Sequence, residues 1–202
     1  MSVPRPLRIV AFGGTLNPAS TSLIALRTVL EEAASRGAET ELIEAGALGL
    51  PIYDWGWPST PAVERFVGSF HGADALVWAS PLYHGTVSGL FKNAIDWLEV
   101  LGSRSPPYLT DKPVGLIGIA GGAQSLQAIT SMEQIVRSLR GWSVPLVVPI
   151  NRASEVFDKG TQSVRDKLVR DQLVALGAEL VRVARMFSQH RAGGGGGEPP
   201  AG

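Results

Sequence analysis

One segment near the N-terminus is rich in groups that can hold an anion: residues 13–22 read GGTLNPASTS. Its two glycines allow close approach to the backbone, and short polar side chains follow them. Asn17-Pro18 favours a turn, and Ser20 or Thr21 is suited to cap a following helix. Free N–H groups at a helix N-terminus, together with hydroxyls, suit a phosphate monoester. The same composition also serves simply to begin a helix after a strand.

Two well-known phosphate motifs are absent from this segment. It contains neither the G-x-G-x-x-G pattern of dinucleotide sites nor the G-x-x-x-x-G-K-[ST] pattern of nucleotide hydrolases. Residues 13–22 also hold no lysine that could reach a triphosphate. The pattern therefore favours a single phosphate, bound by hydroxyls and backbone amides, over a pyrophosphate.

A second segment, residues 80–98, reads SPLYHGTVSGLFKNAIDWL. We expect Pro81 to end a buried strand and to direct the loop that follows. Tyr83 and His84 would then flank a planar ring, and Gly85 would let backbone amides approach the edge of a heterocycle. The alternative interpretation is a loop tyrosine that packs on the next helix.

The composition excludes several other kinds of chemistry. The chain has no cysteine, which rules out disulfides, thiolate nucleophiles and cysteine-ligated metals. Its three histidines, His71, His84 and His190, lack metal-ligand spacing, so we expect no metal site. With 18 basic and 18 acidic residues, the chain has no charge excess to attract nucleic acid or an anionic membrane. No apolar run approaches the roughly 18 residues of a membrane span, and no signal peptide is visible. We therefore predict a cytoplasmic protein.

The elements that must position these segments follow from the hydrophobic pattern. Apolar runs at 7–12, 39–45, 75–80, 114–120 and 144–149 alternate with helical patterns at 21–36, 61–72, 88–101, 124–139 and 162–187. Continuous apolar runs are typical of parallel strands buried on both faces, and strict alternation predicts a doubly wound α/β sheet. The strand orders 2-1-3-4-5 and 3-2-1-4-5 both fit. In either order, ligands bind at the carboxyl ends of the strands, so the loops after strands one, three and four are the candidate site.

Three segments together resemble one known family. GGTLNPASTS, SPLYHGTVSGLFKNAIDWL and GIAGGAQSLQAI are similar to the corresponding segments of the NADPH-dependent FMN reductase family, over residues 7 to about 187. The resemblance implies an α/β, flavodoxin-like, doubly wound five-stranded parallel sheet of order 2-1-3-4-5 in a three-layer α/β/α arrangement. It also implies one FMN-binding domain over residues 1–187.

The resemblance further assigns site residues. It implies that Thr15, Asn17, Ser20, Thr21 and Ser22 bind the phosphate of FMN. It implies that Pro81, Leu82, Tyr83, His84 and Gly85 line the isoalloxazine and ribityl parts, and that Gly121, Gly122, Ala123 and Gln124 form a third loop beside the pyrimidine end. Many relatives carry arginine where this chain has Asn17, so its phosphate affinity is expected to be lower.

The activity implied by the resemblance is the transfer of electrons from NADPH or NADH, through FMN, to a flavin, quinone, azo or similar small acceptor. No catalytic side chain is implied, because flavin N5 carries the hydride chemistry. The alternative is a non-enzymatic FMN electron carrier of flavodoxin type. Such carriers tend to be strongly acidic, whereas this chain has equal numbers of acidic and basic residues. The acceptor and the preferred nicotinamide cofactor stay open.

The helix expected at 88–101 carries more apolar surface than one sheet face covers. Lys92, Asp96 and Glu99 form a single polar stripe, and most other positions are apolar. We predict a homodimer or homotetramer that uses this helix, as members of the family commonly do. The alternative is that the chain's own loops cover the helix.

Two further segments have open or simple interpretations. Residues 50–60, LPIYDWGWPST, carry Tyr53, Trp55 and Trp57, which wall a pocket, form a contact between copies, or cover the end of the sheet. Residues 188–202 are rich in glycine and proline, and we expect them to be a disordered tail.

Overall fold

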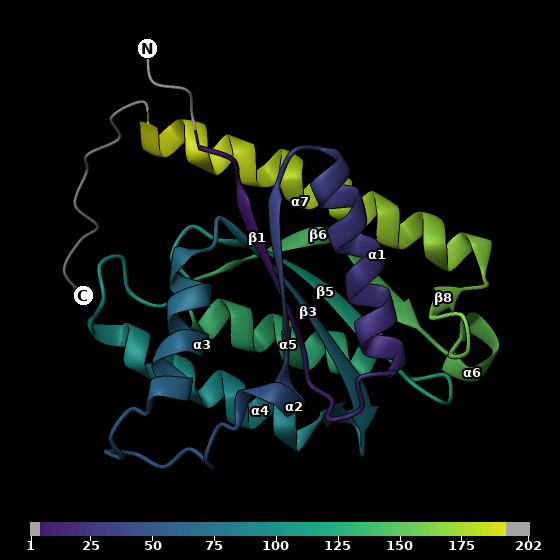
Figure 1. The fold of residues 1–202 in the computed structure, drawn as a ribbon, viewed down its shortest axis with the longest axis horizontal. Helices are drawn as coiled ribbons and strands as arrows, with labels where there is room; N and C mark the ends of the chain where they lie inside the picture. The colour runs from purple at the N-terminus through teal and green to yellow at the C-terminus, as the bar shows by residue number, and fades with distance from the viewer. Residues whose placement is uncertain (1–4, 193–202) are drawn as a thin grey trace.

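The computed structural model describes residues 5–192, which fold around a central parallel sheet (Figure 1). Its strands are β1 (Arg8–Gly13), β2 (Glu39–Glu44), β3 (Ala75–Tyr83), β5 (Pro113–Ile119) and β6 (Trp142–Ile150). They lie in the order β2-β1-β3-β5-β6, and neighbouring strands are parallel. The predicted order 2-1-3-4-5 is therefore confirmed.

Helices cover both faces of the sheet, which gives three layers (Figure 1). Helices α1 (Thr21–Ser35) and α7 (Lys167–Ala192) cover one face, and α3 (Pro61–Gly72), α4 (Gly89–Asp96) and α5 (Leu126–Ser138) cover the other. The shorter elements are α2 (Ala45–Leu48), β4 (Thr86–Val87), η1 (Trp97–Ser103), α6 (Ala153–Val156), β7 (Phe157–Asp158) and β8 (Ser163–Val164). None of the helices within residues 5–192 combines the length and apolarity needed to cross a bilayer.

Burial on both faces explains why the strands read as continuous apolar runs. The first six residues of β3, ALVWAS, are all buried because helices pack above and below them. On the α3–α5 side the core is aromatic: Phe12 lies 5.3 Å from Phe66, 5.9 Å from Phe70 and 5.5 Å from Phe91 between ring centroids. These tilted and edge-on ring pairs stabilise the core beyond the effect of the apolar area that they bury. The core therefore provides a rigid base for the loops at the sheet's carboxyl edge.

The predicted end of the third strand was wrong. β3 continues through Pro81 to Tyr83, and its last residues pair antiparallel with β4, Leu82 with Val87 and Tyr83 with Thr86. Strand β1 stops pairing with β3 at Ala79. The missing amide of Pro81 faces the side where β1 has already ended, so proline breaks no ladder bond there.

Two predicted helices also have different bounds. The helix expected at 88–101 is α helix only as far as Asp96 and then tightens into the 3-10 helix η1. The helix expected at 162–187 begins at Lys167, because Asp158 accepts hydrogen bonds from the N–H groups of Gly160 and Thr161 and turns β7 into β8.

Helix α7 also ends later than predicted, at Ala192. The sequence offers no glycine or proline between residues 188 and 192 to stop it, and the run of glycines begins at 193. The helix therefore includes the first five residues of the predicted tail. The rest of that tail, residues 193–202, lies outside the described residues.

Candidate functional site

The loop between β1 and α1 is shaped by its own polar side chains. Thr15 Oγ1 accepts a hydrogen bond from the Asn17 N–H (3.2 Å), and Asn17 Oδ1 accepts one from the Ala19 N–H (2.9 Å). Ser20 is the N-cap of α1, where its Oγ accepts from the Leu23 N–H (3.3 Å). The prediction of an N-cap at Ser20 or Thr21 is thus confirmed at Ser20. The loop is held in one conformation without any charged group.

The first turn of α1 directs hydrogen-bond donors out of this loop. Thr21 and Ser22 are the first two helical residues, and N–H groups at these positions precede the intrahelical ladder. Thr21 is partly exposed, whereas the Ser22 side chain is buried at 2% exposure. Thr21 is therefore the more accessible of the two residues to a ligand. Together with the Thr15 and Ser20 hydroxyls, this donor set is neutral and suits an anion.

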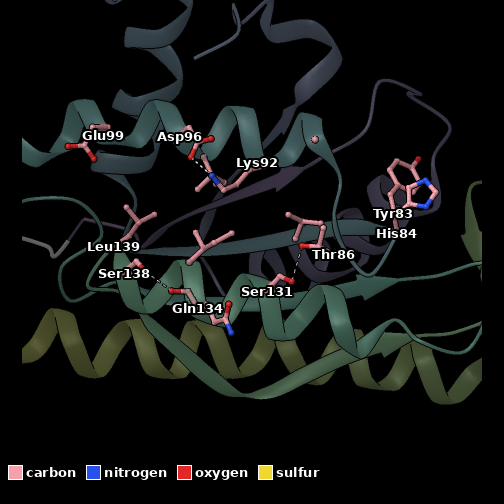
Figure 2. A pocket seen from close by; sticks show the side chains of 14 residues that line it. Tyr83, His84, Thr86, Lys92, Asp96, Glu99, Ser131, Gln134, Ser138 and Leu139 are labelled. Atoms are coloured by element: carbon pink, nitrogen blue, oxygen red, sulfur yellow. Dashed lines mark hydrogen bonds and ion pairs between the residues drawn. The ribbon is translucent and has the colours of Figure 1, made fainter. Parts of the chain in front are cut away.

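The second loop is the tight tip of the β3–β4 hairpin. His84 and Gly85 occupy its two central positions with φ values of 50° and 88°, as a type I′ turn requires. Gly85 fits because glycine adopts positive φ without strain. The hairpin projects Tyr83, which is 58% exposed, together with the exposed His84, to one end of a groove (Figure 2). Pro81 and Leu82 are half-buried in the stem of the hairpin.

A buried serine pair ties these two loops together, and sequence reasoning missed it. Ser80 Oγ accepts from the Ser88 N–H (3.0 Å), and Ser88 Oγ donates to the Gly14 carbonyl (2.8 Å). Ser88 also caps α4 by accepting from the Phe91 N–H (3.1 Å). The Gly14 N–H in turn donates to the Ala79 carbonyl (3.1 Å). Ser88 was detectable as an N-cap from its place before GLFKNAID, but its bond to Gly14 spans 74 residues.

The third loop is fixed to the strand beside it. Ser125 donates through both its N–H (3.1 Å) and its Oγ (2.8 Å) to Asn151 Oδ1, just beyond β6. The Arg152 N–H donates to the Gly122 carbonyl (2.9 Å). Gly121 and Gly122 are exposed, and a Cβ at either would meet no heavy atom within 4 Å. The loop therefore leaves open space above a rigid base, and Ala123 and Gln124 are exposed beside it.

Further contacts join the hairpin to α5, the helix that follows the third loop. Thr86 Oγ1 in the hairpin donates to Ser131 Oγ on α5 (3.0 Å). A Cβ at Gly85 would lie 3.7 Å from Gln127 Oε1, also on α5. With the serine bridge to Gly14, the three predicted loops form one continuous rim at the carboxyl edge of the sheet. The residues within 5–192 contain no group of three His, Asp or Glu side chains placed to hold a metal ion.

A groove of about 950 Å³, here called the helical groove, begins at the hairpin tip and runs between α4 with η1 and α5 (Figure 2). Lys92 and Asp96 form an ion pair at its edge (2.6 Å). Its floor includes Val87, Ile95 and Ile135. Most apolar side chains of residues 88–101 are nevertheless buried within the chain, at 4% exposure or less: Phe91, Ala94, Ile95, Trp97, Leu98 and Leu101. The chain itself therefore covers most of the surplus apolar surface predicted on this helix, as the alternative interpretation expected.

Comparison with known proteins identifies relatives of this sequence. A sequence model of the family described as NADPH-dependent FMN reductase matches residues 7–155. The FMN-dependent NADPH-azoreductase of Staphylococcus aureus is 31% identical over 182 residues, which cover 83% of this chain and 93% of that protein. The azoreductase of the same description from Staphylococcus haemolyticus is 36% identical over 121 residues. That match covers 56% of this chain and 61% of the relative, so it spans less than two thirds of that protein.

A solved structure agrees on the fold. A flavoenzyme NAD(P)H:(acceptor) oxidoreductase from Paracoccus denitrificans superposes with a TM-score of 0.73 at 19% identity, covering 90% of this chain and 98% of that one. The family match includes the β1–α1 loop, the β3–β4 hairpin and the glycines of the third loop, which the structure assembles into one rim. A flavodoxin-like sheet and three matching loops at its carboxyl edge lead to one conclusion: this chain belongs to the NADPH-dependent FMN reductase family.

Proposed function

We propose that this protein is an FMN-dependent oxidoreductase that passes electrons from NADPH or NADH to a small-molecule acceptor. The observation that carries the proposal is the joining of the β1–α1 loop to the β3–β4 hairpin by Ser80, Ser88 and Gly14, with the third loop at the same edge of the sheet. The family match supports the same activity. The azoreductase names of two relatives favour an enzyme over an electron carrier, and they make an azo compound or another flavin or quinone a reasonable acceptor.

The residues present fit FMN at its phosphate end. In the proposal, the hydroxyls of Thr15, Ser20 and Thr21, the Asn17 side chain and the N–H groups at the start of α1 hold the phosphate. Residues 13–22 contain no carboxylate that would repel it. They also contain no cation, so binding rests on neutral donors and is weaker than an arginine would make it.

The residues present also fit the isoalloxazine end of FMN. The proposal places the residues from Pro81 to Gly85 along the ring and ribityl chain, and Gly121, Gly122, Ala123 and Gln124 beside the pyrimidine. The open space above the two glycines leaves room for a planar group and for a second ring stacked on it. Bound FMN would supply the two-electron chemistry, so the chain needs no acid, base or nucleophile of its own.

The protein's own residues would therefore bind FMN and orient its ring. The type I′ turn at His84 and Gly85 fixes the direction of Tyr83 against the ring. Backbone N–H groups of the third loop would stabilise negative charge at the pyrimidine end. We expect residues 1–187 to form one FMN-binding domain that acts in the cytoplasm.

The proposal includes a homodimer or homotetramer. The helical groove is lined in part by the half-buried Ile135 and Leu139 on the α5 side, and a second copy would cover them. Sedimentation of the purified protein at micromolar concentration tests this part alone. A monomer there would reject the assembly and leave the flavin site untouched.

The first experiment is a visible spectrum of the protein with added FMN, followed by NADPH without oxygen. We expect a protein-bound flavin band that bleaches when NADPH is added, whereas free FMN at the same concentration bleaches far more slowly. Flavin that binds but stays oxidised with both NADPH and NADH would favour the carrier. A chain that binds no flavin would contradict both readings.

A further inference from the structure

A second concave surface borders η1 and shares Glu99 with the helical groove, and we call it the aromatic cleft. It has a volume of about 650 Å³, within the range of small-molecule sites. Five of the residues that line it are aromatic: Tyr53, Trp55, Trp57, Trp97 and Tyr108. None of them belongs to the three loops of the flavin site. The loop at 50–60 therefore walls a pocket, which is one of the three roles its sequence left open.

The inner part of the aromatic cleft is rigid. Tyr53 meets Trp97 edge to face, with ring centroids 5.2 Å apart. The Tyr53 N–H donates to Asn93 Oδ1 (2.8 Å), and Trp97 Nε1 donates to the Pro51 carbonyl (2.9 Å). These bonds fix the loop that carries Tyr53 to α4 and η1. A ligand would meet a preformed wall and would not have to order it.

The outer part is open to solvent. Trp55 and Trp57 are 76% and 57% exposed, and Ile52 beside them is 76% exposed. Apolar side chains with this much exposure in one short loop are typical of a binding surface. Their faces remain available for a flat molecule.

The charge of the aromatic cleft is negative. Its lining includes two carboxylates, Asp54 and Glu99, and no basic side chain. Burial raises the pKa of Tyr53 and of Tyr108, and the negative charge of Glu99 raises both further. Glu99 also accepts a hydrogen bond from the Tyr108 hydroxyl (3.2 Å).

One cation already lies over a ring of the cleft. The Arg140 guanidinium is 5.8 Å from the centre of the Tyr108 ring. An electron-rich ring face attracts a cation, most strongly when the ring is indole. Carboxylates beside such rings add a Coulombic attraction and select against anions.

We propose that the aromatic cleft is a second binding site, separate from the flavin loops, for a small planar aromatic cation. The flat part of such a ligand stacks on Trp55 and Trp57 against the fixed Tyr53–Trp97 wall. Its positive charge lies toward Asp54 and Glu99. A neutral ligand of the same shape gains only the stacking, and an anion is repelled.

Calorimetric titration of FMN-saturated protein tests the proposal, because the flavin loops are then occupied. Three two-ring probes of similar size differ in charge: 1-methylquinolinium, quinoline at pH 8 and 2-naphthoate. We expect 1-methylquinolinium to bind about tenfold more tightly than quinoline, and 2-naphthoate not to bind. Equal binding of the cation and quinoline, or absence of binding by all three, would overturn the proposal.

Matched variants locate the site. Trp57 and Trp142 have the same exposure, 57%, but Trp142 lies on β6 against Phe187, away from the cleft. We expect Trp57→Ala to weaken 1-methylquinolinium binding at least about fivefold and Trp142→Ala to leave it unchanged. Asp54→Asn should reduce the preference for the cation over quinoline. Equal effects of the two tryptophan variants would overturn the assignment.

A second copy of the chain is the competing occupant of this surface. If a copy covers the aromatic cleft, wild-type protein will not bind 1-methylquinolinium, and Trp57→Ala will lower the sedimenting mass. That pair of results would replace the proposal with a contact between copies. The flavin spectrum of each variant, unchanged from wild type, would show that the flavin site is independent of either outcome.

Discussion

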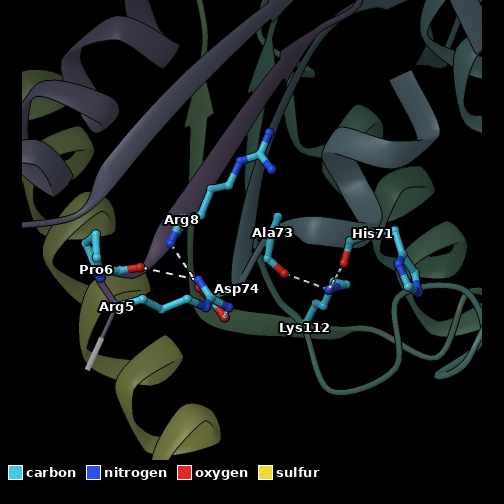
Figure 3. A network of polar contacts seen from close by, with 7 residues as sticks. All are labelled: Arg5, Pro6, Arg8, His71, Ala73, Asp74 and Lys112. Carbon is cyan, nitrogen blue, oxygen red and sulfur yellow. Dashed lines mark hydrogen bonds and ion pairs between the residues drawn. The ribbon is translucent and has the colours of Figure 1, made fainter. Parts of the chain in front are cut away.

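The two ends of the central sheet treat polar groups in opposite ways. At the amino-terminal end, two buried charged groups have hydrogen-bond partners: Asp74 accepts two hydrogen bonds from Arg5 (2.8 and 2.9 Å), and Lys112 Nζ donates to the carbonyls of His71 (2.8 Å) and Ala73 (2.6 Å) (Figure 3). At the carboxyl end, the three loops hold neutral hydroxyls, amides and open glycines.

This difference indicates that the amino-terminal end of the sheet contributes to stability and the carboxyl end to binding. Lys112 is 6% exposed and satisfies carbonyls at the end of α3, where a helix leaves acceptors without partners. The carboxyl end keeps donors at the start of α1 directed outward and buries only the serines that hold the loops in register. Variants at the amino-terminal end should therefore change the free energy of unfolding, and variants at the carboxyl end should change flavin affinity.

The largest expected effect is on stability. Lys112→Met removes the ammonium that satisfies two carbonyls, and we expect a loss of about 2–3 kcal/mol in unfolding free energy with unchanged FMN affinity. Urea denaturation and a visible titration with FMN measure the two quantities. Lys167→Met is the control, because its side chain is 87% exposed and should change stability by no more than about 0.5 kcal/mol. Equal losses in the two variants would break the contrast between the ends.

Gly14→Ala tests the carboxyl end at its tightest point. The added Cβ would lie 2.5 Å from Phe91 Cβ and 2.8 Å from Ser88 Oγ, so the loop must shift. We expect FMN to bind at least about tenfold more weakly, with a stability loss of about 1–2 kcal/mol. Gly68→Ala is the matched control. Nothing lies within 4 Å of its Cβ, and alanine favours its helix. Normal flavin affinity in Gly14→Ala would contradict a coupled rim.

Ser88→Ala removes the bridge without adding atoms. It loses the bond to the Gly14 carbonyl and the cap of α4, and we expect about 1–2 kcal/mol lower stability and several-fold weaker FMN binding. The exposed Ser138→Ala, which loses one bond to the Gln134 carbonyl, should affect neither. The same urea and FMN titrations separate the two variants.

Asn17→Arg should sharpen the contrast by placing a cation at the neutral end. We expect FMN to bind roughly fivefold more tightly at low salt, because a charge-assisted bond to phosphate outweighs the lost Asn17–Ala19 turn. Riboflavin, which lacks the phosphate, is the control and should show no gain. A gain for riboflavin equal to that for FMN would place the phosphate elsewhere.

The smallest expected effect concerns an exposed ion pair beyond β6. Hydrogen bonds from Arg165 lower the pKa of Asp158 to about 2, below its ordinary 3.8. Because the pKa of Asp158 is lower in the folded protein than in the unfolded chain, its ionised form stabilises the fold. This stabilisation is complete above about pH 4 and is lost as the pH falls through about 2. Arg165→Gln should raise the Asp158 pKa toward 3.8 in a carboxyl NMR titration, with no measurable change in thermal stability at pH 7. An unchanged pKa would exclude Arg165 as its cause.

Features that depend on neighbouring residues could be predicted from the sequence. The alternation of apolar runs and helical patterns predicted the five strands, and Ser20 was identified as a cap, because these signals depend on near neighbours. Pro81 was misread for the same reason: a proline ends a strand only where its missing N–H has a partner to lose, and that depends on where β1 stops. The I′ turn at His84 and Gly85 carried a local signal, but the expected end of the strand hid it.

Residues 13–22, 80–98 and 118–129 were chosen from sequence as three separate loops, and only the fold made them one rim. The sequence by itself determined the elements, their order along the chain and the chemistry of each loop. The tertiary structure decided that Ser88 bonds to Gly14, that Lys112 satisfies the end of α3 and that Tyr53 meets Trp97. These pairs are 39–74 residues apart in sequence, and no local propensity specifies them. They follow from right-handed crossovers and from burial on both faces of the sheet, which act on the whole chain at once.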